Sequence, residues 1–288
     1  MVFVPDTKNK YPYPEDTSSH YLVVKKNRGI IFDENYHYIE TSKSFRFVRW
    51  WVRFLLRVLV FPAAYIRLGL KVTGKKNLKN NKKLIKNGVV TISNHIHLWD
   101  YICIMSTLRN YRWPNVIVWD KNINGENGTL MRYVGGIPIP VNNIKGTIAF
   151  SNTISKLLND GGILQIYPEG SMWEFYQPIR PFKDGFASIA IKNNKPVIPY
   201  AFSNRKPGFI RRVIFKQIAL FNLNIGKPIF ANENLDVKEE EIDLMKRCHE
   251  AMVELAGIKK GTNIYEPIYN HSKKYHLNCF LKNIIIFP

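Results

Sequence analysis

The sequence has few cysteines, and their placement favours neither a disulfide framework nor a zinc site. They are scattered, odd in number and form no CxxC pair: Cys103, Cys248 and Cys279. Disulfide-dependent secreted proteins use many paired cysteines, and structural zinc sites need clustered ligands. We therefore expect a reducing environment and no bound metal.

Long apolar stretches are also missing. The uncharged run between Arg57 and Arg67 is far shorter than the roughly 18 apolar residues that a membrane-spanning helix needs. Residues 1–40 are polar and charged, and they lack the apolar centre of a secretory signal. We expect a cytoplasmic protein whose contact with a membrane is peripheral, on the cytoplasmic side.

Acidic residues are scarce relative to basic ones. The chain carries 42 Lys and Arg against 22 Asp and Glu, a formal net charge of +20. Such an excess attracts a polyanion, which is a nucleic acid, an anionic membrane surface or an acidic carrier protein. The charge alone leaves these three partners open.

The 288 residues are enough for one large α/β domain with a substantial core. We divide the chain into an irregular extension at 1–40, an amphipathic membrane-interfacial helical segment at 41–70, a main domain at 71–262 and a C-terminal tail at 263–288. The end of the tail, residues 275–288, is expected to be either a second, weaker membrane contact or a last core strand.

Short apolar runs alternate with helical stretches in the main domain. Strands are predicted at 88–92, 115–120, 162–167, 196–202, 212–216 and 223–229, and helices at 144–159 and 184–193. Asp236, with Glu239 three residues later, is a capping-box signal for a last helix. This alternation predicts an α/β fold with a mostly parallel central sheet flanked by helices.

The segment 44–70 is a basic amphipathic helix, expected to break or kink near Pro62. Its arginines share one narrow face, and apolar side chains such as Phe47, Phe54 and Val58 cover the other side. One alternative is a helix packed on the core with solvated arginines. The other, which we favour, lies on anionic lipid with arginines at headgroup phosphates and aromatics at the acyl boundary. The predicted membrane contacts are Arg46, Arg49, Trp50, Trp51, Arg53 and Arg57.

The stretch SNHIHLWD, residues 93–100, follows the predicted strand at 88–92 and carries two histidines and an aspartate. A histidine takes a proton from a hydroxyl when a carboxylate fixes its tautomer and stabilises the imidazolium. His95 and Asp100 would lie about 140° apart on one regular helix. We therefore expect His95 in a strand-to-helix turn, with Asp100 on the first helical turn, at the edge where open α/β sheets bind ligands. We expect His97 to be a loop histidine that donates to a backbone carbonyl.

A second polar cluster, YPEGS at 167–171, follows the predicted strand at 162–167. Gly170 permits a tight turn and close approach by a ligand. Glu169 is suited to accept from a substrate hydroxyl, and Ser171 to cap the next segment or bind phosphate. The alternative is a plain turn with a capping serine. Because two such clusters lie at neighbouring strand ends, we favour a functional site over a plain turn.

Four blocks follow one another along the chain: Asn94-His95-x4-Asp100, Gly136-Ile137-Pro138-Ile139-Pro140, Tyr167-Pro168-Glu169-Gly170-Ser171 and Pro196-Val197-Ile198-Pro199. In this order they resemble the four blocks of the glycerolipid (lysophosphatidate-type) acyltransferases. The resemblance covers about residues 70–230, and its first and third blocks together are a specific signal. KVTGKKNL at 71–78 also resembles the short strand that opens that domain.

The resemblance implies that 71–262 is an acyltransferase domain of phospholipid biosynthesis. It would move a fatty acyl group from acyl-CoA or acyl carrier protein to a hydroxyl of a lysophospholipid or glycerol phosphate. By the same resemblance His95 is the general base, Asp100 orients it, and the acceptor is bound by Asn94, Glu169, Gly170 and Ser171. The thioester is a co-substrate, and no covalent acyl-enzyme, metal or cofactor is required. A GxSxG nucleophile motif is absent from the sequence.

The chain departs from the family at its phosphate-binding arginines. Members usually carry one just after the second block and one after the Glu-Gly-Ser/Thr turn, suited to bidentate contact with phosphate. Here Val141-Asn142 and Met172 stand at those places. We expect Arg180 and Lys183 to substitute, and the alternative is that both are ordinary loop charges.

Two rival functions remain. A catalytically idle lipid-binding relative is compatible with the missing arginines. A nucleic-acid-binding protein would explain the charge, but the sequence has no helix-turn-helix, zinc-finger or RNP pattern. We expect an acyl thioester donor, a lysophospholipid or glycerol-phosphate acceptor and an anionic membrane surface as partners, and no nucleic acid.

Overall fold

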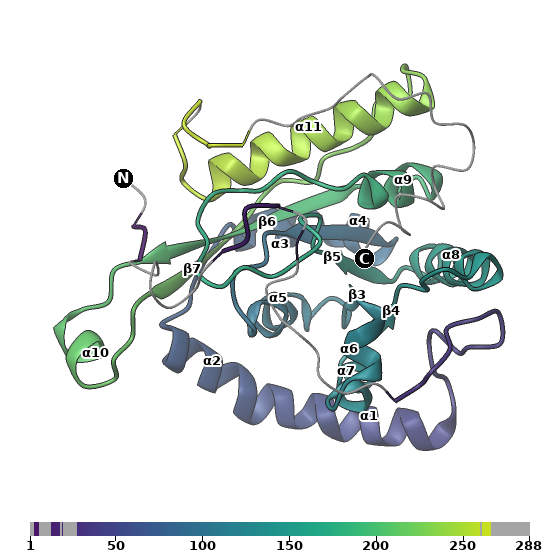
Figure 1. Cartoon of the computed structure of the whole chain (residues 1–288), viewed down its shortest axis with the longest axis horizontal. Coiled ribbons are helices and arrows are strands. Elements are labelled where there is room, and N and C mark those ends of the chain that lie inside the picture. The colour runs from purple at the N-terminus through teal and green to yellow at the C-terminus, as the bar shows by residue number, and fades with distance from the viewer. Residues whose placement is uncertain (1–2, 6–12, 18, 20–27, 260, 266–288) are drawn as a thin grey trace.

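Seven short strands form one mixed sheet among the residues that the structure describes (Figure 1). The computed structural model describes residues 3–5, 13–17, 19, 28–259 and 261–265. The strands are β1 (Lys71–Thr73), β2 (Val89–Ser93), β3 (Asn115–Val118), β4 (Gly136–Pro138), β5 (Ile163–Ile166), β6 (Val197–Arg205) and β7 (Leu220–Ile225). Their order is β1-β7-β6-β2-β5-β3-β4, and only the β6–β7 pair is antiparallel. The predicted α/β fold with a mostly parallel sheet is confirmed.

The central strand, β2, is buried over its whole length between β5 and β6. A strand covered on both faces is expected to be a nearly continuous apolar run, which the sequence VVTIS nearly is. Because β2 and β5 run parallel, the loops that follow them emerge at the same edge of the sheet. Both polar clusters of the sequence therefore meet there.

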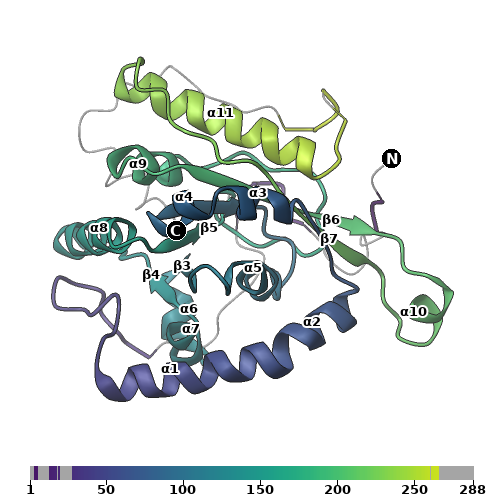
Figure 2. The ribbon, with the colours of Figure 1, turned by 180° about the vertical axis from the view of Figure 1, so that it is seen from behind.

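Helices cover both faces of the sheet (Figures 1 and 2). One face packs against α8 (Ile144–Asn159), α9 (Gly185–Lys192) and α11 (Val237–Leu255). The other packs against α3 (Lys75–Asn80), α4 (Lys82–Lys86) and α5 (Asp100–Leu108). Two short helices, α6 (Asp120–Asn124) and α7 (Gly128–Tyr133), connect β3 to β4. As predicted, Asp236 is the N-cap residue of α11, and its side chain accepts from the N–H groups of Lys238 and Glu239.

A long N-terminal helix runs along the outside of α5 and α7 (Figure 1). It consists of α1 (Lys43–Leu55), a π-helical turn (Leu56–Val60) and α2 (Phe61–Leu68). The π-helical turn ends at Val60, two residues before Pro62, which has no N–H to donate, so the predicted break is present as a change of helix type. None of the described helices has both the length and the apolarity to cross a bilayer.

The orientation of this helix differs from both of the expected ones. Arg49 and Arg53 face the domain, where the Arg53 guanidinium lies 5.0 Å from the centre of the Trp113 ring. Burial lowers the pKa of Arg49 and lowers that of Arg53 to about 10. The apolar side is exposed instead: Phe47, Val48, Trp50, Trp51, Phe54, Leu55, Val58 and Leu59. Arg49 and Arg53 were predicted to contact lipid headgroups, but in the structure the Arg53 guanidinium lies over Trp113 of the domain and that of Arg49 lies over Phe45 of its own helix.

The predicted strand at 212–216 is also wrong. Residues Phe209–Val213 form the short helix α10 at the tip of the β6–β7 hairpin, and their neighbours up to Lys216 join no strand. The last predicted strand, 223–229, lies at Leu220–Ile225, and β4 was not predicted. Among residues 1–40, the described ones contain neither helix nor strand, and the predicted domain boundaries stay predictions. The expectations for residues 275–288 fall outside the described part of the chain.

Asn94, the residue after β2, joins this strand to β6. Its side-chain amide donates to the Phe202 carbonyl at 3.0 Å and its oxygen accepts from the Phe202 N–H at 2.7 Å. Asn94 is fully buried, so both backbone groups of Phe202 depend on it. Asn94 was predicted to bind substrate, but the structure commits its polar atoms to the fold.

We predict that Asn94→Ala lowers the free energy of unfolding by about 2–4 kcal/mol, because it leaves a buried N–H and a buried carbonyl unpaired. Chemical denaturation monitored by circular dichroism measures the change. Asn234→Ala, at an exposed asparagine, is the control and should stay within about 0.5 kcal/mol of the parent. Equal stability of the two variants would contradict the role given to Asn94.

Candidate active site

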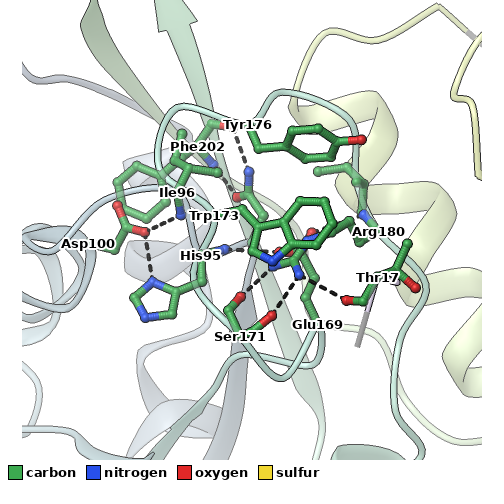
Figure 3. Close-up of polar contacts among 12 residues, drawn as sticks. Thr17, His95, Ile96, Asp100, Glu169, Ser171, Trp173, Tyr176, Arg180 and Phe202 are labelled. Carbon is green, nitrogen blue, oxygen red and sulfur yellow. Dashed lines mark hydrogen bonds and ion pairs between the residues drawn. The ribbon is translucent and has the colours of Figure 1, made fainter. Parts of the chain in front are cut away.

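The carboxyl end of β2 places a histidine and an aspartate side by side (Figure 3). His95 lies in the turn after the strand, and Asp100 is the first residue of α5. The His95 Nδ1 atom is 3.1 Å from Asp100 Oδ2, and the two side chains are 25% and 2% exposed. This is the turn-and-helix geometry that the five-residue spacing predicted.

The Asp100 carboxylate is fixed by the backbone of the same turn. Its Oδ2 atom accepts from the N–H groups of Ile96 at 2.7 Å and His97 at 2.9 Å, besides its contact with His95. A carboxylate held this way accepts a hydrogen bond from a protonated Nδ1. The neutral imidazole of His95 then carries its lone pair on Nε2. Within the described part of the chain, Nε2 makes no hydrogen bond. The imidazole is thus oriented with its basic nitrogen free for a substrate.

A tyrosine ring from the second cluster supports the imidazole. Tyr167, just after β5, stacks on His95 with the ring centres 3.9 Å apart and the planes inclined by 18°. Stacking blocks rotation of the imidazole out of the plane that faces Asp100. Tyr167 was part of the predicted motif, but no role was assigned to it, because only the parallel pairing of β2 and β5 brings the two rings together.

The two strand-end loops are joined by backbone hydrogen bonds. Trp173 N–H donates to the His95 carbonyl at 3.0 Å, and Phe175 N–H donates to the Ile96 carbonyl at 2.8 Å. The His95 N–H in turn donates to Glu169 Oε2 at 3.2 Å. The turn that carries His95 is therefore held on both sides by residues 169–175.

A buried ion pair fixes the second loop (Figure 3). The Arg180 guanidinium lies 2.9 Å from Glu169 Oε2, and both side chains are 1% exposed. Arg180 also donates to the Ser171 hydroxyl and carbonyl and to the Thr17 carbonyl, and it stacks on Trp173. We predicted that Glu169, Ser171 and Arg180 bind substrate. The structure uses the polar atoms of Glu169 and Arg180 within the protein, where they position the loop.

Part of the N-terminal extension covers this loop. The Tyr13 ring stacks on Trp173 with centres 5.6 Å apart, and its hydroxyl donates to the Glu174 carbonyl. Trp173 Nε1 donates to the Ser19 carbonyl at 3.2 Å. These contacts were not predicted from the sequence. The two tyrosines in YPYPED, residues 11–16, were a signal that the extension packs against another part of the protein. The extension thus contributes to the support of the site.

Lys183 approaches the site beside Gly170. A Cβ atom on Gly170, whose φ is +80°, would lie 2.8 Å from both Cε and Nζ of Lys183. The glycine therefore leaves room for the ammonium group at the loop's exposed turn. Burial, reinforced by the nearby charge of Arg180, lowers the pKa of Lys183 to about 8. The prediction that Lys183 contacts an anionic substrate is compatible with this position.

His97 has a structural environment. Its Nδ1 atom accepts from the Trp99 N–H at 3.1 Å, and its ring packs against Phe175 and Phe221. Burial lowers its pKa, which favours the neutral ring. We expected His97 to donate to a backbone carbonyl, but it accepts from a backbone N–H. The contact with Asp100 that would be needed for a base is made by His95 alone of the two rings.

The fold thus brings together seven predicted residues at one edge of the sheet: His95, Asp100, Glu169, Gly170, Ser171, Arg180 and Lys183. The predicted membrane contacts lie elsewhere, on the N-terminal helix (Figure 1). Within the described residues, no group of three or more His, Cys, Asp or Glu side chains is placed to hold a metal ion.

A known protein family matches the part of the chain that carries this site. The family model described as Acyltransferase matches residues 69–203, which include both strand-end clusters. This segment is similar to the acyltransferase family. Comparison with curated proteins gives no match.

One similar solved structure is the 1-acyl-sn-glycerophosphate (LPA) acyltransferase PlsC from Thermotoga maritima. It is 18% identical in sequence, with a TM-score of 0.47, and the alignment covers 76% of this chain and 83% of that one. The family match confirms the resemblance inferred from the motifs. The boundaries predicted for the acyltransferase domain, 71–262, extend beyond the matched segment and stay a prediction.

We predict that Tyr167→Leu lowers kcat for acyl transfer by about 10- to 100-fold with little change in KM, because the imidazole loses the ring that fixes its plane. Steady-state kinetics with a labelled acyl thioester measure both constants. Tyr167→Phe keeps the ring and should restore most of the activity. If Tyr167 had a purely structural role, both variants would lose stability, and the kcat values of Tyr167→Leu and Tyr167→Phe would not differ in this way.

Proposed function

We propose that the protein is a peripheral membrane O-acyltransferase that transfers a fatty acyl group from acyl-CoA or acyl carrier protein to a hydroxyl of a lysophospholipid or glycerol phosphate. The carrying observation is the His95–Asp100 pair, with Nδ1 held at 3.1 Å from a buried carboxylate and Nε2 free. The acyltransferase-family match supports the reaction class. The resemblance of the four motif blocks to those of glycerolipid acyltransferases suggests the kind of acceptor.

The transfer needs one base and no covalent enzyme intermediate. His95 Nε2 takes the proton of the acceptor hydroxyl as its oxygen attacks the thioester carbonyl. Asp100 stabilises the imidazolium that forms. As the tetrahedral intermediate collapses, the carbon–sulfur bond breaks, and the imidazolium returns the proton to the thiolate. The products are an ester and a free thiol, and His95 is neutral again.

The acceptor phosphate would be bound by Lys183. Its ammonium lies beside Gly170, in the loop that also holds His95 through Glu169. The positions after the second and third blocks offer Asn142 and the buried Met172 in place of the family's arginines, and neither carries a charge. A single lysine is a point charge rather than a bidentate clamp, so we infer that the chain recognises phosphate less selectively than arginine-bearing relatives.

Membrane association would come from the exposed apolar side of α1. Trp50, Trp51 and Phe54 lie on this side and are 57%, 46% and 44% exposed. Arg46, at the border of this side, is exposed and suited to headgroup phosphates, whereas Arg57 lies over the Trp113 ring and donates to the Arg109 carbonyl at 3.0 Å. The net charge of +20 suits the anionic cytoplasmic leaflet. A lipid acceptor and a helix that faces lipid thus both support a location of the enzyme at the membrane surface.

A catalytically idle lipid-binding relative is the second candidate, favoured only by the missing arginines. The intact His95–Asp100 pair speaks against it, since a binding protein has no need of a buried carboxylate aimed at a partly exposed imidazole. A nucleic-acid partner is less well supported, because the exposed side of α1 is apolar and its inner arginines contact the domain.

We predict that His95→Ala lowers kcat for acyl transfer by about 100- to 10,000-fold, because the general base is lost. A screen of lysophospholipid and glycerol-phosphate acceptors with both donors, read by mass spectrometry, measures product formation. His97→Asn is the matched control, since an amide oxygen replaces Nδ1 as the acceptor for Trp99 N–H. Full activity of His95→Ala together with loss in His97→Asn would overturn the assignment, and no transfer by the parent would favour the idle relative.

We also predict a pH effect on acceptor binding that depends on Lys183. Its pKa of about 8 means that the ammonium is present below this pH and lost above it. KM for an anionic acceptor should therefore rise as pH increases through 8, while KM for an uncharged monoacylglycerol should not. Lys183→Gln should have a high KM for the anionic acceptor at all pH values, and Lys227→Gln, an exposed lysine, should behave as the parent. A parallel rise for both acceptors would contradict this role.

A further inference from the structure

The tip of the β6–β7 hairpin, residues 206–216, is an exposed apolar surface that the acyl-transfer mechanism does not use. Its large apolar side chains are between 51% and 71% exposed: Phe209, Ile210, Val213, Ile214 and Phe215. Soluble domains seldom expose so many neighbouring apolar side chains without a partner. The apolar run at 212–216, which was predicted to be a strand, therefore lies outside the sheet with its side chains exposed.

The hairpin tip is attached to the end of the N-terminal helix. Arg211 donates to the Ile66 carbonyl at 2.9 Å, and Gln217, just after the tip, donates to the Arg67 carbonyl. At the end of β6, just before the tip, Arg205 donates to the Gly69 carbonyl. These contacts satisfy carbonyls of the last turn of α2, where cationic donors are favourable. The tip therefore has a fixed position beside the helix (Figures 1 and 2).

The exposed apolar surface continues from the tip to the helix. Ile66, whose carbonyl accepts from Arg211, is itself 71% exposed. Further along the helix follow Leu59, Val58, Leu55, Phe54, Trp51 and Trp50, all exposed. In both views the tip projects past the C-terminal end of α2, at the other end of the helix from the start of α1 (Figures 1 and 2).

The charges of the tip favour anionic lipid. Residues 206–216 contain Lys206, Arg211, Arg212 and Lys216 and no acidic residue. Cations interleaved with exposed Phe and Ile side chains suit the boundary between headgroups and acyl chains. A second copy of the chain is disfavoured as the partner, because it would bring another +20 charge to a basic surface.

We propose that the hairpin tip is a second membrane-binding element, which inserts Phe209, Ile210, Ile214 and Phe215 into an anionic bilayer beside the N-terminal helix. This inference deepens the proposed function, on whose membrane location it rests. One helix on a bilayer leaves the domain free to rotate about the helix axis. A second contact at the end of that helix removes this rotation and holds the His95 edge of the sheet at a constant height above the lipid.

The test is vesicle binding by the full-length protein in the absence of substrate. Flotation with phosphatidylcholine vesicles, alone or mixed equally with phosphatidylglycerol, measures the partition coefficient. The triple variant Ile210→Ser, Ile214→Ser and Phe215→Ser should bind the anionic vesicles at least about tenfold more weakly than the parent. Hydrogen exchange of the backbone amides of residues 206–216 should slow when the parent binds these vesicles.

The matched control carries the same three substitutions at exposed residues far from the tip: Ile144→Ser, Ile148→Ser and Phe230→Ser. Ile144 and Ile148 begin α8, at the opposite side of the molecule from α10 (Figure 1). Phe230 follows Ile229, which bridges Val197 at the far end of β6. This variant should bind as the parent does.

Acyl transfer to a detergent-solubilised acceptor separates the two proposals, since the tip variant should keep this activity. If the parent protein itself transfers no acyl group, the proposed function is contradicted, and the second membrane contact is then tested by vesicle binding only. Parent-like vesicle binding by the tip variant, or unchanged hydrogen exchange at 206–216, would overturn the second membrane contact. So would a change in oligomeric state of the tip variant in vesicle-free solution with unchanged binding, because the tip would then contact another copy.

Discussion

The buried ion pair between Glu169 and Arg180 is the interaction on which the rest of the site depends. Both side chains are 1% exposed, so the desolvation cost of the two charges is recovered only through well-placed hydrogen bonds. Glu169 accepts from the backbone N–H groups of His95 and Arg180, and the Arg180 guanidinium donates to Ser171 and Thr17. Removing either partner would leave an uncompensated charge and release both loops. We regard this pair as the reason that the site has one shape.

The chemistry follows from what this scaffold fixes and what it leaves free. Asp100 is held by two backbone N–H groups, and the ring of Tyr167 supports the imidazole of His95. Every neighbour of the imidazole is therefore placed before a substrate arrives, which lowers the reorganisation needed in the transition state. The Nε2 atom of His95 makes no hydrogen bond to the described residues, and the ammonium of Lys183 lies beside Gly170 of the second loop. They are the two groups that an acyl acceptor with a hydroxyl and a phosphate would require.

The N-terminal helix shows how context reverses an amphipathic pattern. Its arginine face was expected to point to water or lipid, yet Arg53 lies against Trp113 and the apolar side is exposed. Cation–π contacts permit burial of guanidinium groups, and a bilayer permits exposure of tryptophan. The hairpin tip at residues 206–216 likewise exposes apolar side chains that the sequence pattern placed in the fold. An apolar run that looked like a core strand lies outside the sheet, beside the end of the helix.

Much of the fold and the core of the site could be predicted from the sequence, because they rest on local patterns. Alternating apolar runs identified the parallel sheet, the cap at Asp236 located the last helix, and five-residue spacing placed His95 and Asp100 around one turn. The internal roles of Asn94, Glu169 and Arg180 and the stacking of Tyr167 depend on partners distant in sequence. So does the outward side of the helix, since amphipathicity defines two faces but only packing decides which one meets the domain.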